Sequence, residues 1–141
     1  MEIVADSGGI YGLYDRRDPA HVGLRRVLES ERTPVVIPSV TLGEIDYLFR
    51  SRLGNRAMLL FLDDIHQGAF RIESVTAEDL ARCRDLLTHY ADANLGLSDA
   101  SVAATADRLG TNRILTVDVR DFRLLRTIRG KPFRLLPADL S

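Results

Sequence analysis

Ile114-Leu115-Thr116-Val117-Asp118 is a short apolar run, rich in β-branched residues, that ends directly at a carboxylate. β-Branched residues favour strands, and a continuous apolar run indicates a strand that is buried on both of its faces. Similar runs recur along the chain and alternate with longer stretches of helical periodicity. This alternation is typical of βα units that build a parallel sheet. The sequence therefore predicts an α/β fold in which helices cover both faces of the sheet.

The boundaries of these elements follow from apolar spacing and from capping residues. The expected strands are residues 2–5, 34–37, 69–75, 113–117 and 133–136, and the expected helices are residues 19–30, 41–53, 56–66, 76–90 and 98–109. Helix 76–90 opens with the capping signature Thr76-Ala77-Glu78-Asp79, and its expected apolar face carries Leu80, Cys83, Leu86 and Leu87. Helix 19–30 is expected to bury Val22, Val27 and Leu28.

Length and composition restrict the class of protein. The 141 residues suit one compact domain spanning residues 1–141, and the net charge of −1 gives no overall attraction to nucleic acid. Cys83 is the lone cysteine, so an internal disulfide is excluded and a reducing cytoplasm is expected. No run of about 18 apolar residues suggests a membrane span.

Acidic residues follow two of the expected strands. Asp6 comes directly after Ile3-Val4-Ala5, and Asp118 occupies the equivalent position after the run quoted above. Ligands of parallel α/β sheets bind at the carboxyl ends of the strands, where these two side chains should meet. Asp99 lies in the first turn of helix 98–109, which Ser98 is expected to cap, and Glu44 lies near the start of helix 41–53.

Each acid also has a purely structural explanation. Asp6 could cap the next helix, Asp99 could stabilise a helix dipole, and Glu44 could complete a capping box with Thr41. If the four acids converge, however, two carboxylates roughly 4 Å apart repel by about 4 kcal/mol at an effective dielectric of about 20. An all-oxygen cluster of this kind favours a hard divalent cation, Mg²⁺ or Mn²⁺, over zinc or copper.

Two longer blocks resemble a known family. They are Tyr90-Ala91-Asp92 followed by Leu95-Gly96-Leu97-Ser98-Asp99-Ala100-Ser101, and Ile114-Leu115-Thr116-Val117-Asp118-Val119-Arg120-Asp121-Phe122. With the order Asp6, Glu44, Asp99 and Asp118, they resemble PIN domains over nearly the whole chain, in particular the VapC toxins of bacterial toxin–antitoxin pairs. The first motif differs slightly, because Asp6-Ser7-Gly8 stands where the family more often has Asp-Thr-Ser or Asp-Thr-Gly.

The resemblance implies a three-layer sandwich around a five-stranded parallel sheet and a metal-dependent endoribonuclease activity. It further implies a homodimer and inhibition by a cognate VapB-like antitoxin. The implied catalytic residues are Asp6, Glu44, Asp99 and Asp118, of which Asp6, Asp99 and Asp118 would hold Mg²⁺ or Mn²⁺. The possible additional site residues are Asp121, Ser7 and Asp92.

The surroundings of this site can be anticipated in part. Six arginines near the acidic ends could contact the RNA backbone, at positions 16, 17, 50, 52, 120 and 123. An apolar groove for the antitoxin could be lined by Leu13, Tyr14, Ile45, Leu48 and Phe49, although these residues could equally belong to the core.

The acids also allow three rival interpretations. A haloacid-dehalogenase-like phosphatase requires a second Asp two residues after the first, where this chain has Gly8. A phosphoacceptor receiver domain requires a Lys at the end of the last strand, whereas Lys131 precedes it. The more serious alternative is a catalytically inactive PIN-like module that binds RNA or protein without cutting.

Overall fold

The computed structural model describes residues 1–140 and is built around one five-stranded sheet with the order β3-β2-β1-β4-β5. The strands are β1 Val4–Ala5, β2 Val35–Pro38, β3 Phe70–Glu73, β4 Arg113–Leu115 and β5 Arg134–Leu136. Every neighbouring pair is parallel, and Val4 of β1 lies opposite Val36 on one side and Ile114 on the other. The carboxyl ends of all five strands therefore share one edge.

Helices connect the strands. The α-helices are α1 Ser7–Tyr14, α2 His21–Ser30, α3 Leu42–Arg52, α4 Asn55–His66, α5 Ala77–His89, α6 Leu97–Leu109 and α7 Val119–Leu124, and the 3₁₀ helices are η1 Ser39–Thr41 and η2 Ala91–Ala93. Thr76 caps α5 with the expected capping box, since its hydroxyl accepts from the Asp79 amide while the Asp79 carboxylate accepts from the Thr76 amide. Gly110 ends α6 in the left-handed conformation that favours glycine.

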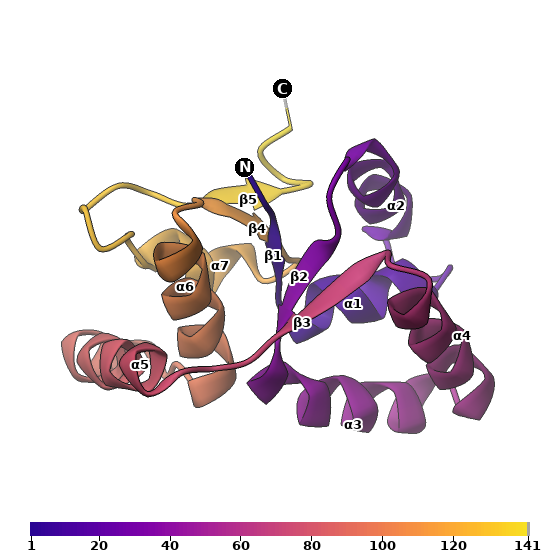
Figure 1. Cartoon of the computed structure of the whole chain (residues 1–141), viewed down its shortest axis with the longest axis horizontal. Coiled ribbons are helices and arrows are strands. Elements are labelled where there is room, and N and C mark those ends of the chain that lie inside the picture. The colour runs from indigo at the N-terminus through magenta and orange to yellow at the C-terminus, as the bar shows by residue number, and fades with distance from the viewer. Residues whose placement is uncertain (141) are drawn as a thin grey trace.

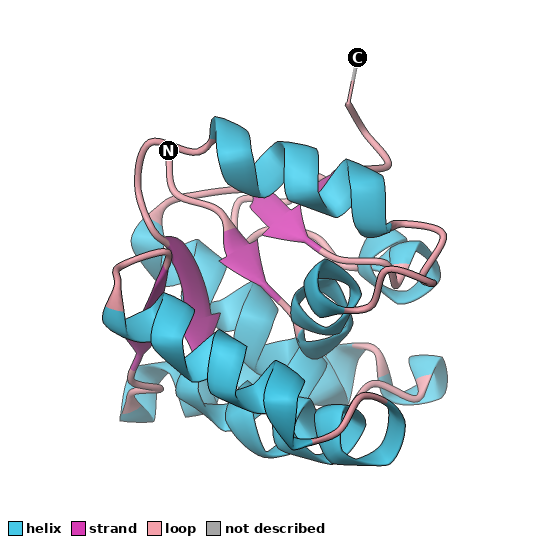
Figure 2. Ribbon diagram, turned by 90° about the vertical axis from the view of Figure 1, so that its right-hand side faces the viewer, coloured by secondary structure: helices cyan, strands magenta, loops and turns pink. Residues whose placement is uncertain are grey.

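The sheet separates two apolar cores, because successive side chains of a strand point to opposite faces. In β1, Ala5 belongs to the core beneath α1, α2, α3 and α4, whereas Val4 belongs to the core beneath α5, α6 and α7. β2 divides in the same way, with Val35 and Ile37 on one face and Val36 on the other. Figures 1 and 2 show helices on both sides of the strands, so the expected three-layer α/β architecture is confirmed.

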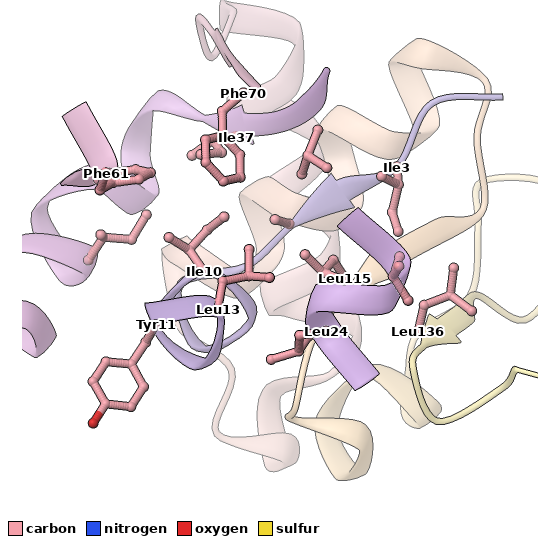
Figure 3. Packing of buried hydrophobic residues seen from close by; sticks show 14 of the residues in the cluster. Ile3, Ile10, Tyr11, Leu13, Leu24, Ile37, Phe61, Phe70, Leu115 and Leu136 are labelled. Carbon is pink, nitrogen blue, oxygen red and sulfur yellow. The ribbon is translucent and has the colours of Figure 1, made fainter. Parts of the chain in front are cut away.

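The core beneath α1–α4 combines aliphatic and aromatic side chains. Figure 3 shows Ile10 and Leu13 of α1 directed toward the strands, while the Tyr11 hydroxyl points away from them. Phe61 of α4 packs against Phe49 of α3 and Phe70 of β3, each with ring centroids 5.6 Å apart. Such tilted aromatic pairs stabilise the fold beyond the area they bury.

Several details of the sequence prediction are wrong. All five strands and the five expected helices exist, but the strands are mostly shorter, and α1 and α7 were not anticipated. Leu80 and Val22 are 46% and 64% exposed, because Asp79 and Leu24 occupy the buried faces of α5 and α2 instead. Ser98 lies inside α6, whose N-cap is Gly96.

The five residues that were expected to line an antitoxin groove do not form one. Leu13, Ile45 and Phe49 are buried, and Tyr14 and Leu48 pack against the same core. The reason is that α1 and α3 turn these apolar faces toward each other and the sheet rather than toward solvent.

Cys83 is buried as a core residue, as expected. In the part of the chain that the structure describes, no helix has the length and apolar character needed to cross a membrane.

Candidate functional site

Asp6 lies where β1 ends and α1 begins. Its Oδ1 accepts from the Gly9 amide at 2.7 Å, which makes Asp6 the N-cap of α1, and its Oδ2 accepts from the Thr116 hydroxyl at 2.5 Å. The backbone amide of Asp6 donates to the Leu115 carbonyl. A Cβ on Gly9 would lie 2.4 Å from that same carbonyl oxygen, so only glycine allows α1 to approach β4 this closely.

Asp118 lies three residues beyond β4 and caps α7. Its Oδ1 accepts from the Asp121 amide at 3.3 Å, and its own amide donates to the Thr116 hydroxyl oxygen at 2.9 Å. Thr116 therefore connects the two acids: its hydroxyl donates to Asp6 and accepts from Asp118. This arrangement fixes the β1 and β4 carboxylates relative to each other.

Asp99 completes a compact acidic group. It lies in the first turn of α6, and one carboxylate oxygen from each of Asp99, Asp118 and Asp121 lies within 4.8 Å of the other two. Three acids from two separate segments thus meet at the carboxyl edge of the sheet. Asp6 stands outside this group of three, but it belongs to the same electrostatic environment, because the charges of Asp99 and Asp118 raise its pKa.

Glu44 approaches from the first turn of α3, where it accepts a hydrogen bond from the Ser7 hydroxyl. The alternative capping box is wrong, because the Thr41 hydroxyl donates to the Pro38 carbonyl and makes no cap hydrogen bond. Ser7 instead holds Glu44 beside the end of β1. The Glu44 charge raises the pKa of Asp99, so Glu44 belongs to the same electrostatic environment as the aspartates.

Burial and mutual repulsion raise the pKa values of these aspartates. Burial raises the pKa of Asp6 to about 7, against the lowering effect of the hydrogen bonds from Thr116 and Gly9 and with further increases from Asp99 and Asp118. The pKa of Asp99 rises to about 6 through burial and through the charges of Asp118, Glu44 and Asp121. Burial also raises the pKa of Asp118.

The chemistry of this group suits a hard cation. Carboxylate oxygens within 4.8 Å of one another can share an ion bound at about 2.0 to 2.6 Å, the range for Mg²⁺ and Ca²⁺. The candidate group contains no His or Cys, so it lacks the nitrogen and sulfur ligands typical of zinc. Each carboxylate oxygen has two lone pairs, so the hydrogen bonds of Asp6 still leave it able to bind a cation.

The remaining expected site residues behave differently. Asp92 is exposed on η2, and within residues 1–140 no side-chain hydrogen bond joins it to the other acids. Of the six arginines, Arg17, Arg50 and Arg123 form ion pairs with Asp15, Asp46 and Asp139. Arg52 lies over the Tyr11 ring. Arg120 acts on the acids, since its charge lowers the pKa of Asp118.

Thr116 is a site residue that the sequence analysis missed. It was assigned to a strand as one of several β-branched residues, and its position two residues before Asp118 was the available signal. Its hydroxyl stabilises the ionised form of Asp6, because a hydrogen bond to a carboxylate favours the charged state.

We therefore expect Thr116→Val to raise the pKa of Asp6 further. A hydrogen bond to a charged group contributes about 1.5 to 3 kcal/mol, which corresponds to about one to two pKa units. The measurement is the increase in melting temperature on adding Mg²⁺, recorded from pH 5 to pH 9. Its midpoint should move to higher pH in Thr116→Val and stay in place in Thr116→Ser, which keeps the hydroxyl. An unchanged midpoint in the Val variant would show that Thr116 has no such role.

Comparisons with known proteins agree with this geometry. The PIN domain family model matches residues 3–127. Ribonuclease VapC26 of Mycobacterium tuberculosis is 30% identical over 135 residues, which cover 96% of this chain and all of the relative.

Solved structures show the same fold. The crystal structure of M. tuberculosis VapC20, described as a toxin that cleaves the sarcin–ricin loop, matches with a TM-score of 0.74 and 23% identity over 85% of this chain and 92% of the other. A toxin–antitoxin complex from Klebsiella pneumoniae matches with a TM-score of 0.65 and 20% identity over 86% and 90%. On the strength of the family match and of its similarity to VapC26, this chain belongs to the PIN-domain family.

Proposed function

We propose that this chain is a metal-dependent endoribonuclease and the toxin of a toxin–antitoxin pair, acting in the cytoplasm. The observation that carries the proposal is the convergence of Asp99, Asp118 and Asp121 at the carboxyl edge of the sheet, with Asp6 beside them. The similarity to a ribonuclease over the full length of that relative supports the same chemistry.

In this proposal Asp6, Asp99 and Asp118 hold Mg²⁺ or Mn²⁺, and Asp121 is an additional ligand. The cation would make a bound water more acidic and neutralise charge on the scissile phosphate. Glu44, held by Ser7, orients the attacking water from the α3 side. The raised pKa values of Asp6 and Asp99 follow first from their burial and then from the charges of the neighbouring carboxylates, whose repulsion a bound cation would relieve.

The direct test is cleavage of labelled RNA by the purified protein with Mg²⁺, with Mn²⁺ and with EDTA. We expect cleavage with either metal and none with EDTA, and we expect products with a 5′-phosphate and a 3′-hydroxyl because the attack does not use the ribose 2′-OH. Asp92→Asn is the matched control: this exposed acid lies seven residues from Asp99, and its loss should leave the rate unchanged. Cleavage that continues in EDTA, or 2′,3′-cyclic phosphate ends, would refute the metal mechanism.

The alternative function is an inactive PIN-like module that binds RNA without cutting it. Such a module would bind RNA equally well in EDTA and in Mg²⁺, and Asp99→Asn would change neither binding nor cleavage. The convergence of Asp99 with Asp118 and Asp121 favours the nuclease, because a binding module gains nothing from grouping carboxylates that repel one another.

The proposed protein partner is a VapB-like antitoxin. Since the residues first expected to form its groove belong to the core, we place the antitoxin contact on other apolar side chains, which are exposed on α3 and α4. Tyr47 is 63% exposed, and Leu59, Leu60 and Leu62 are each at least half exposed. The match to a toxin–antitoxin complex supports an antitoxin as a partner, and we propose that an apolar segment of it covers this face. The homodimer stays a separate prediction, tested by the mass in solution.

We expect Leu59→Asp together with Leu62→Asp to weaken inhibition by the antitoxin encoded beside this gene at least tenfold. Both side chains are exposed, so the loss reflects the missing apolar contact and not the fold. The measurement is the antitoxin concentration that halves RNA cleavage. Leu80→Asp, exposed on α5 at the other side of the sheet, should leave inhibition intact. Equal inhibition of both variants would place the antitoxin elsewhere, and a change from dimer to monomer would assign the face to a second copy.

A further inference from the structure

A pocket of about 460 Å³ lies between the C-terminal half of α5 and the segment that follows α7. Arg84 and His89 of α5, with Tyr90 at its C-cap, line one side, and Arg126 and Ile128 line the other. A second pocket of about 470 Å³ borders the same segment and is lined by Arg129 and Lys131. Thr127 and Ile128 line both pockets. We call this surface the basic groove and define it by Arg84, His89, Tyr90, Arg126, Arg129 and Lys131.

The groove is positively charged although the whole chain has a net charge of −1. Arg84, Arg129 and Lys131 are exposed, and among residues 1–140 none of the three forms an ion pair. Arg126 donates to the carbonyls of Arg123 and Leu125, which orients its guanidinium without neutralising it.

The acidic residues that line these pockets do not cancel this charge. Asp107 is paired with Arg82 at 3.2 Å and also accepts from the Ile128 amide, so its charge is already compensated. Asp85 lines the first pocket and is exposed. Four cationic side chains therefore face one free carboxylate, which favours an anionic polymer.

Aromatic rings lie beside these charges. The ring centroids of His89 and Tyr90 lie 4.6 Å apart, with an angle of 80° between the ring planes, and His89 is exposed. Aromatic rings together with basic side chains are how proteins bind single-stranded nucleic acid, since bases stack on the rings while phosphates contact the cations. An acidic protein segment would use the charges but gain little from the rings.

Two helices connect the groove to the acidic site. α7 begins at the capping residue Asp118 and spans six residues, about 9 Å, before the groove segment starts. Ile128 is tied to Asp107, which lies eight residues after Asp99 on α6, about 12 Å along the helix axis. A single strand that leaves the acids could therefore follow this side of the molecule to the groove, where Figure 1 shows the segment after α7 near α6.

We propose that the basic groove binds a single-stranded segment of RNA that flanks the bond cut at the acidic site. The inference rests on the proposed nuclease function and adds where the rest of the substrate is held. Arg129 and Lys131 lie beyond residue 127, where the match to the family model ends. Its effect is on substrate affinity, and it takes no part in bond cleavage.

The test is binding of a fluorescein-labelled, 20-nucleotide, mixed-sequence single-stranded RNA to the metal-stripped protein in EDTA, by fluorescence anisotropy at several salt concentrations. The groove variant combines Arg84→Ala, Arg129→Ala and Lys131→Ala. The matched control combines Arg26→Ala, Arg32→Ala and Arg56→Ala, three exposed arginines on the α2–α4 side that form no ion pair among residues 1–140. Both variants lose the same charge, so a difference between them reports position.

We expect the groove variant to bind at least tenfold more weakly near 0.1 M salt and to lower the slope of log affinity against log salt by about 2, as loss of three phosphate contacts predicts at about 0.7 each. The control should stay within twofold of the wild type. Equal weakening in both variants, or in neither, would overturn the proposal, as would stronger competition by poly-glutamate than by unlabelled RNA.

His89→Ala should weaken binding without changing the slope, and an unchanged affinity would refute base stacking there.

The outcome separates this proposal from the nuclease itself because binding is measured without metal. RNA binding that depends on the groove, in a protein that cuts no RNA with Mg²⁺ or Mn²⁺, would support the groove and refute the nuclease. Metal-dependent cleavage with an unchanged KM and affinity in the groove variant would support the nuclease and refute the groove.

Discussion

Asp6→Asn is expected to make the metal-free protein more stable at pH 8 while removing its response to Mg²⁺. The pKa of Asp6 is raised to about 7, whereas an Asp in an unfolded chain has a pKa of about 3.9. Between these values the folded state binds more protons than the unfolded state, so stability falls as pH rises from about 4 to about 7. Above about pH 7 the cost is about 4 kcal/mol, from about three pKa units.

Asn has nearly the same shape and removes this cost. Its carbonyl oxygen can still accept from the Gly9 amide, and its NH₂ group can donate to the Thr116 hydroxyl oxygen. The measurement is urea unfolding in EDTA at pH 5 and pH 8. The free energy of unfolding of the wild type should fall between pH 5 and pH 8. The variant should lose much less, because only the smaller contribution of Asp99, which both proteins share, remains.

Adding Mg²⁺ should then raise the free energy of unfolding of the wild type more than that of Asp6→Asn. At a hundredfold excess over its dissociation constant, the metal should stabilise the wild type by about 2.7 kcal/mol and the variant far less. Asp92→Asn should behave as the wild type throughout, because Asp92 is exposed. If Asp6→Asn instead proves less stable than the wild type at pH 8 without metal, Asp6 is primarily a helix cap.

Asp99→Asn is expected to lower the rate of RNA cleavage by about a thousandfold. Asp99 contributes one of the three converging carboxylates. A bound cation stabilises the transition-state charge by several kcal/mol, and a loss of about 4 kcal/mol lowers the rate about a thousandfold. The fold should be preserved, since Asp99 lies in the first turn of α6 and makes no helix cap.

The measurement is single-turnover cleavage with protein in excess over labelled RNA, beside RNA binding in EDTA. Binding should be retained or improved, because the variant removes a negative charge from a site that faces phosphate. A variant that cuts at the wild-type rate would exclude Asp99 from the metal site. One that loses binding and cleavage together would point to a folding defect, which the far-UV circular dichroism spectrum would detect.

Much of this architecture could be predicted from local patterns. The apolar runs identified all five strands, because a strand that is buried on both faces has few polar residues. Thr76 identified the start of α5 through its capping box. Asp6 and Asp118 were placed at one edge because parallel strands end together. Asp121 was anticipated only as a possible additional site residue implied by the family resemblance, and it belongs to the compact acidic group.

The rest depends on contacts that are distant in sequence. α1 is short and carries three glycines, so its helical pattern is weak, and it forms because Asp6 caps it and Gly9 fits against β4. The partner of Glu44 could not be inferred, because the hydrogen bond from Ser7 spans 37 positions and competes with a plausible local cap. Leu13, Ile45 and Phe49 resembled a surface groove in the sequence, since apolar spacing does not distinguish a face covered by another helix from one left open.

The hydrogen bond between Thr116 and Asp6 has a further consequence for how the protein becomes active. It joins residues 110 positions apart, so the acids cannot meet until β4 has inserted beside β1. A contact of such long sequence separation requires a large loop to close, which costs chain entropy before the contact stabilises the fold. A nascent or partly folded chain therefore carries every acidic residue through Asp99 and still has no site. For a chain proposed to be a toxin, activity would begin only when the central strands have paired.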